Sequence, residues 1–95
     1  VGAEEAKELG IVNEVVPQAD LMDTARKWAK DIEACSPMSI RATKQVAYQS
    51  LDESDLEKSM QNGNYSAVGE LLNSEDFVEG PVAFAEKRAP EWKGR

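Results

Sequence analysis

Only one segment of this 95-residue chain has the composition of a β-strand, and that limits the fold more than any other feature. Ile11, Val12, Val15 and Val16 form a β-branched run, which Pro17 ends. A single strand cannot form a sheet, because each strand needs a partner for its backbone hydrogen bonds. The sequence therefore predicts a mainly α fold of four to five helices with one short N-terminal extended segment.

Apolar residues at helical spacing predict the other elements. Ser36, with Pro37 at the first helical position, and Ser74 have the composition of helix N-caps. Asp20 is expected to cap the helix that follows it, and Gly10 suits the left-handed backbone at the end of the first helix. The helices are expected at about residues 3–9, 21–35, 37–51, 56–71 and 75–89.

The last helix contains Pro81, which should kink it or delay its regular part, before Pro90 stops it. Helices two to five should pack through their apolar faces. The expected cluster comprises Trp28, Ile32, Ile40, Leu51, Leu56, Met60, Leu71 and Phe84.

The charges are unevenly placed along this acidic chain, whose formal charge is -7. Residues 52–79 hold eight acidic side chains and one basic side chain, so the net charge of this segment equals that of the whole chain. Residues 87–95 hold Glu91 and four of the 11 Lys and Arg residues: Lys87, Arg88, Lys93 and Arg95. Such a tail suits an anionic ligand with an aromatic face, or else a solvated helix end whose cations favour the helix dipole.

Residues for catalysis or metal binding are scarce. Without histidine, the chain has no His-based triad and no His metal ligand. Its one cysteine, Cys35, is interpreted as a small buried hydrophobe, and its acidic clusters as solvated helix faces or caps. We therefore predict no catalytic residue, no metal site and no covalently bound cofactor. Net acidity argues against nucleic-acid binding, no apolar run could span a membrane, and cysteine usage favours a cytoplasmic setting.

Three stretches, in this order, resemble the crotonase (enoyl-CoA hydratase/isomerase) superfamily. They are GAEEAKELGIVNEVVP (residues 2–17), the Ser36-Pro37 junction with Lys44 downstream, and SEDFVEGPVAFAEKRAPEW (residues 74–92). The resemblance implies a C-terminal helical region, with residues 1–17 as a helix–strand remnant of the crotonase core and residues 18–95 as the helical part of a single domain. It also implies that the oxyanion hole and paired glutamates lie upstream. The isolated chain should then be inactive.

The family's helices drive trimer formation and cover a neighbouring acyl-CoA site. The resemblance thus implies that the partners are acyl-CoA, bound weakly or not at all by this chain alone, the rest of its enzyme, and sister subunits in a trimer or dimer of trimers. By motif position, Phe84 would face the acyl or pantetheine pocket, Lys87 would approach CoA phosphate, and Val68 would take a pocket-facing position. A core position for Phe84 and a packing role for Trp92 are open alternatives.

Two functions compete with an enzyme part of fatty acid or related acyl-CoA metabolism. A stand-alone helical module could bind another protein through its apolar faces. A non-catalytic domain could bind acyl-CoA, which micromolar CoA binding by the chain would support. Upstream ββα repeats in the reading frame would favour the enzyme part, and a start codon directly before Val1 would favour the module.

Overall fold

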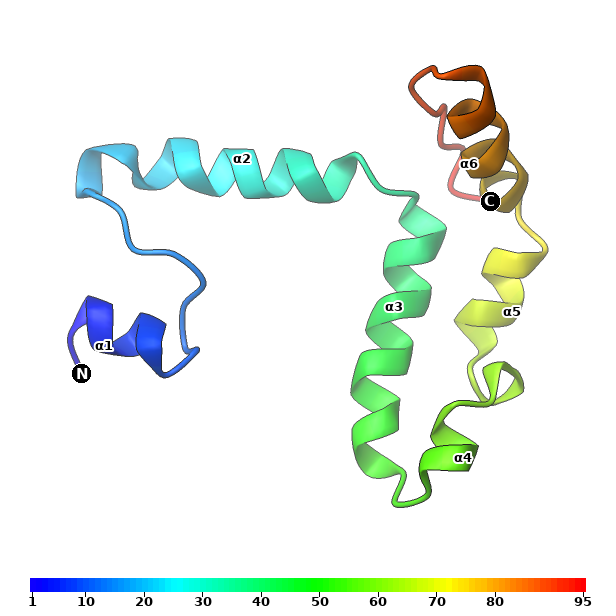
Figure 1. Ribbon diagram of the computed structural model, residues 1–95, viewed down its shortest axis with the longest axis horizontal. Helices are drawn as coiled ribbons and strands as arrows, with labels where there is room; N and C mark the ends of the chain where they lie inside the picture. Colours follow the sequence, from blue (N-terminus) through cyan, green and yellow to red (C-terminus); the bar gives the residue numbers. More distant parts are fainter. The chain divides into compact units, whose positions relative to one another are not determined.

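The computed structural model describes residues 1–95 and contains helices but no strand (Figure 1). This confirms the mainly α fold. Short 3-10 turns occupy Gln18–Asp20, Ser50–Asp52 and Asn62–Asn64. No helix is both long and apolar enough to cross a membrane. The six α-helices are α1 (Ala3–Glu8), α2 (Leu21–Glu33), α3 (Pro37–Gln49), α4 (Leu56–Ser59), α5 (Ser66–Leu72) and α6 (Glu75–Glu86).

The chain forms two compact units, Val1–Asp31 and Ile32–Arg95. The boundary between them falls inside α2, not after residue 17. The single-domain organisation with a helix–strand remnant over residues 1–17 therefore stays a prediction.

In the first unit, Gly10 ends α1 as its position in the sequence predicts. Its φ is 72°, and the N–H groups of Gly10 and Ile11 donate to the carbonyls of Lys7 and Ala6 at 3.0 and 2.8 Å. This pair of bonds is a Schellman motif. Residues 11–17 then follow a bent path without strand pairing, because the unit offers no second strand.

The second unit has α3 and α5 side by side (Figure 1). Ser36 caps α3 as predicted: its hydroxyl accepts from the N–H groups of Met38 and Ser39 at 3.1 and 3.3 Å. Gln45 links the two helices, because its side-chain oxygen accepts from the Ala67 N–H at 2.7 Å. This bond satisfies one of the unpaired donors at the start of α5.

The prediction of one helix over residues 56–71 is wrong. The helix stops after Ser59, turns through Asn62–Asn64 and begins again at Ser66. Asparagine and glycine favour turns there, and the Asn64 side-chain amide donates to the Lys58 carbonyl at 2.7 Å. Tyr65 stabilises the turn from inside, since it is 5% exposed and its hydroxyl donates to the Ser59 carbonyl at 2.6 Å.

The predicted apolar cluster does not form within this chain. Ile40 and Leu71 are half-buried, but its other six members are exposed. Helical periodicity indicates that a face is apolar but does not say what covers it. The buried hydrophobic residues are instead Met38, Ala42, Tyr65 and Ala83.

Two further sequence expectations concern α6 and Cys35. α6 runs through Pro81 without interruption and ends at Glu86, before Pro90. Cys35 is exposed, so its interpretation as a buried hydrophobe is wrong. It lies between α2 and α3, where a loop leaves too few neighbours to cover it.

We expect Phe84→Ala to change the free energy of unfolding by less than about 0.5 kcal/mol. The ring is 87% exposed, so its removal leaves no cavity. The buried Tyr65 supplies the comparison, because Tyr65→Ala should cost about 3 kcal/mol. Urea unfolding followed by far-UV circular dichroism measures both. A loss for Phe84→Ala as large as that for Tyr65→Ala would contradict the exposed position.

Candidate functional site

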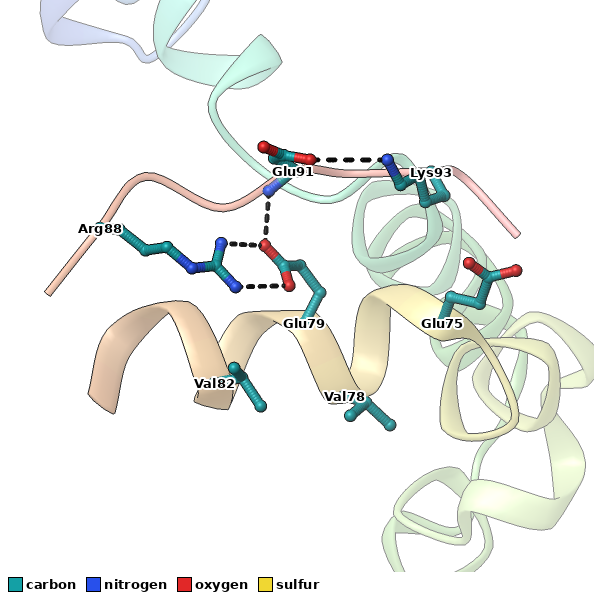
Figure 2. Close-up of a pocket in the computed structure, with 7 residues that line it drawn as sticks. All are labelled: Glu75, Val78, Glu79, Val82, Arg88, Glu91 and Lys93. Atoms are coloured by element: carbon teal, nitrogen blue, oxygen red, sulfur yellow. Dashed lines mark hydrogen bonds and ion pairs between the residues drawn. The ribbon is translucent and has the colours of Figure 1, made fainter. Parts of the chain in front are cut away.

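Residues 88–95 form a tail that folds back along α6 (Figure 2). The tail has no regular secondary structure of its own after residue 88, so its backbone groups need partners elsewhere. Two carboxylates of α6, those of Asp76 and Glu79, supply several of them. The main-chain oxygen of Arg95 in turn accepts from the Glu75 N–H at 2.7 Å, which satisfies a donor at the start of the helix.

Asp76 joins the tail to the start of α3. Its carboxylate is 3% exposed and accepts from the N–H of Lys93 at 2.7 Å, from the N–H of Gly94 at 3.1 Å and from the Ser36 hydroxyl at 2.6 Å. Burial by itself would raise the pKa of Asp76, but these donors outweigh it and lower the pKa. The residue is therefore a buried, charged hub and not a solvated helix-start acid.

Gly94 allows the tail to turn into this carboxylate. Its φ is 71°, in the left-handed region that glycine adopts without steric cost. The turn directs consecutive N–H groups, those of Lys93 and Gly94, at the same oxygen.

Glu79, one turn further along α6, holds the other end of the tail. Arg88 donates from both terminal nitrogens to the two carboxylate oxygens, one at 3.0 Å, and the Glu91 N–H donates at 2.7 Å (Figure 2). The bonds from Arg88 and then from the Glu91 N–H lower the pKa of Glu79 to about 2. The same pairing, with a second contact from Glu86 at 2.7 Å, raises the pKa of Arg88.

Trp92 packs the tail down, which confirms the packing alternative for this residue. The indole N–H donates to the Ala34 carbonyl at 2.9 Å. Its ring lies against Gly80, where an added Cβ would be 3.4 Å from the nearest ring carbon. Trp92 thus reaches both α6 and the loop before α3.

Beside the tail lies a groove of about 600 Å³. Apolar and charged side chains of both signs line it, so it has no single charge preference. They are Glu75, Val78, Glu79, Val82, Arg88, Glu91 and Lys93 (Figure 2).

Lys87 occupies the turn between α6 and the tail. Its φ is 56°, and it is the only non-glycine residue with a left-handed backbone. The N–H groups of Lys87 and Arg88 donate to the carbonyls of Phe84 and Ala83 at 3.2 and 3.1 Å, which closes the helix end. The Lys87 side chain is exposed.

The predicted site residues separate into two places. Phe84 lies one turn before Lys87 and is 87% exposed, so it is not a core residue of this chain. Val68 is half-buried and lines a different groove, of about 380 Å³, with residues of α3 and with Leu71. Neither Phe84 nor Lys87 lines that groove. Their contacts with CoA remain predictions.

Sequence reasoning missed the part played by Asp76 and Glu79, which it assigned to the start of the helix. A signal was present: the two acids stand three residues apart, on one face of α6, and the tail supplies Arg88 and free backbone donors. No three His, Cys, Asp or Glu side chains converge into a metal site.

Acid should release the tail. The pKa of Glu79 is about 2 in the folded chain against an ordinary 4.5, so the unfolded state binds more protons between these values. Stability from this carboxylate is therefore complete above about pH 5 and is lost as the pH falls towards 2, and Asp76 acts in the same direction. Trp92 fluorescence in a Trp28→Phe background measures the release.

Glu79→Gln is the control for this pH dependence. It should lower the free energy of unfolding at neutral pH and weaken the dependence between about pH 5 and 2, because the titrating group is gone. An unchanged acid transition in Glu79→Gln would show that another group controls the release.

Lys87→Gly should stabilise the chain by about 0.5 kcal/mol. Relief of the left-handed strain, ~1–2 kcal/mol, exceeds the ~0.4–1 kcal/mol that glycine costs through the entropy of the unfolded chain. Lys93→Gly is the matched control and should destabilise, because Lys93 does not have a positive φ. Urea denaturation compares the two, and a loss of stability in both would contradict the strain at Lys87.

Curated relatives match the chain over its whole length. A carnitinyl-CoA dehydratase from Escherichia coli O157:H7 is 47% identical over 98 residues, and one from Proteus mirabilis is 44% identical over the same length. Each alignment covers 100% of this chain and 37% of the relative. The chain therefore spans little more than a third of the length of these relatives.

Solved structures share the fold. An enoyl-CoA hydratase/isomerase from Mycobacterium paratuberculosis superposes with a TM-score of 0.90 at 30% identity, covering 100% of this chain and 37% of that one. An enoyl-CoA hydratase from Bacillus anthracis gives 0.88 at 34% identity, with 100% and 36% covered. The all-helical chain matches the helical C-terminal region of the crotonase fold. The family model described as enoyl-CoA hydratase/isomerase matches residues 1–95, and the chain belongs to that family.

Proposed function

We propose that this chain is the C-terminal, oligomer-forming and CoA-site-covering part of an enoyl-CoA hydratase/isomerase-like enzyme of acyl-CoA metabolism. The observation that carries the proposal is the family match over all 95 residues, in a chain that spans 37% of its relatives. The catalytic groups would come from the remainder of the enzyme. The isolated chain would be inactive, and the enzyme would work in the cytoplasm on fatty or related acyl thioesters.

Exposed apolar side chains support an oligomer-forming part. Only four hydrophobic residues are buried, whereas each of the helices α2 to α6 carries a large apolar side chain that is at least 40% exposed, among them Leu21, Leu56 and Val82. A soluble protein rarely leaves so much apolar surface in water. The rest of the enzyme and sister subunits, in a trimer or dimer of trimers, would cover these faces.

The end of α6 supports a contact with acyl-CoA. Phe84 and Lys87 are three residues apart and both exposed, so an aromatic ring and an ammonium group are available at the same end of α6. CoA carries an apolar pantetheine arm and several phosphates. Phe84 would contact the arm, and Lys87 would contact a phosphate. Val68 would contribute from its separate groove to the acyl pocket.

A chimeric enzyme tests this. The 98 matched residues of carnitinyl-CoA dehydratase from E. coli K12 are replaced by this chain, which is 46% identical. Lys87→Ala in the chimera should raise KM for carnitinyl-CoA several-fold and leave kcat nearly unchanged, because the phosphate does not change during the reaction. The absorbance of the unsaturated thioester product follows the rate.

Two controls accompany the measurement. Lys58→Ala removes an exposed lysine from α4 and should leave KM unchanged. A pantetheine thioester lacking the nucleotide should respond little to Lys87→Ala, and higher salt should shrink the effect on the CoA substrate. A fall in kcat alone, or equal effects on both substrates, would refute the phosphate contact.

A further inference from the structure

We propose that Glu79 and Arg88 are positioning residues, which hold the turn at Lys87 in the one backbone conformation that presents its ammonium group to the ligand. This inference rests on the proposed function for its ligand, a CoA phosphate. Neither Glu79 nor Arg88 would touch the ligand. They would act through the backbone on either side of Lys87.

The strain at Lys87 requires such support. A left-handed backbone is unfavourable for a residue with a side chain, so the turn at Lys87 persists only where its surroundings determine it. The N–H groups of Lys87 and Arg88 fix the helix side of the turn, because they donate to the carbonyls near the end of α6. Something must also fix the side towards the tail.

Arg88 supplies that second constraint. It follows Lys87 directly, and its guanidinium group binds both oxygens of Glu79, which lies nine residues earlier on α6 (Figure 2). A paired guanidinium–carboxylate contact restricts orientation more than a single hydrogen bond does. Arg88 therefore cannot rotate away without breaking two bonds.

Glu79 also captures the tail beyond the turn. Its carboxylate accepts from the Glu91 N–H at 2.7 Å, so residues 88 and 91 are held at one point on α6. The side chain of Glu79 is 19% exposed, against 39% for Arg88. The partly covered carboxylate is thus the fixed element, and the turn carrying Lys87 is clamped between it and the helix end.

Glu75 provides a control residue for Glu79. Glu75 is a carboxylate on the same helix and lines the same groove. It pairs with Arg95 at 3.0 Å and not with Arg88, and its side chain is 60% exposed. Glu75→Gln makes the same change in charge as Glu79→Gln without touching the turn.

Amide hydrogen exchange on this chain gives the first readout. Glu79→Gln should speed exchange of the Lys87, Arg88 and Glu91 N–H groups at least tenfold, while the N–H groups in the middle of α6 keep their protection. Glu75→Gln should leave those three unchanged. Unaltered exchange at residues 87, 88 and 91 in Glu79→Gln would overturn the proposal.

Kinetics of the chimera give the second readout. Glu79→Gln should raise KM for carnitinyl-CoA by about the same factor as Lys87→Ala and leave kcat nearly unchanged, and the double variant should add little. A general loss of stability would lower the active fraction and hence the apparent kcat instead. If Lys87→Ala raises KM and Glu79→Gln does not, the positioning role is wrong.

Failure of the proposed function has a different signature. KM would then stay unchanged in Lys87→Ala itself, whatever the exchange rates show. Faster exchange in Glu79→Gln together with an unchanged KM in both variants would refute the CoA contact, and with it the ligand-presenting part of the positioning role.

Discussion

The buried carboxylate of Asp76 is the interaction on which the second unit depends. It collects donors from the start of α3 and from the tail, so three segments that are distant in sequence meet at one side chain. A buried charge without such partners would be strongly unfavourable, and here hydrogen bonds satisfy it. The Ser36 hydroxyl takes part twice, because it accepts from α3 amides while it donates to Asp76.

The family motif in the last third of the chain is therefore largely a folding motif. Ser74 caps α6 through the Phe77 N–H at 3.1 Å, Asp76 and Glu79 bind the tail, and Ala83 is 1% exposed. The side chains that the family likeness assigned to CoA, those of Phe84 and Lys87, are exposed, and so are Phe77 and Val78 in the same stretch.

Local signals in the sequence predicted local structure well. The caps at Ser36 and Ser74 and the glycine after α1 depend on neighbours within four residues, and the structure confirms them. Asp20 is the end of a 3-10 turn that leads directly into α2. The break before Ser66 was not predicted, because it depends on Tyr65 being buried, which periodicity does not reveal.

Long-range features could not be read from the sequence in the same way. The prediction of the apolar cluster was wrong because periodicity does not identify the surface that covers an apolar face. The roles of Asp76 and Glu79 were not predicted because their partners lie 9 to 40 residues away in sequence. Propensities alone predicted only a set of helices. The resemblance to the family identified these helices as the C-terminal region of a known fold. The residues proposed to touch CoA depend wholly on that likeness, because nothing in their spacing distinguishes them from other exposed side chains.

The span of the tail contacts has a consequence for the order of events during synthesis. Trp92 bonds to Ala34 across 58 residues, and Gly94 bonds to Asp76 across 18. Closing a long loop costs conformational entropy before the contact can stabilise anything. A chain leaving the ribosome could form α3 and α5 early, but its charged hub would stay open until residue 94 had emerged. Until then water would supply the hydrogen bonds that the Asp76 carboxylate later receives from the tail. Chaperones would encounter the helices in this incompletely folded form.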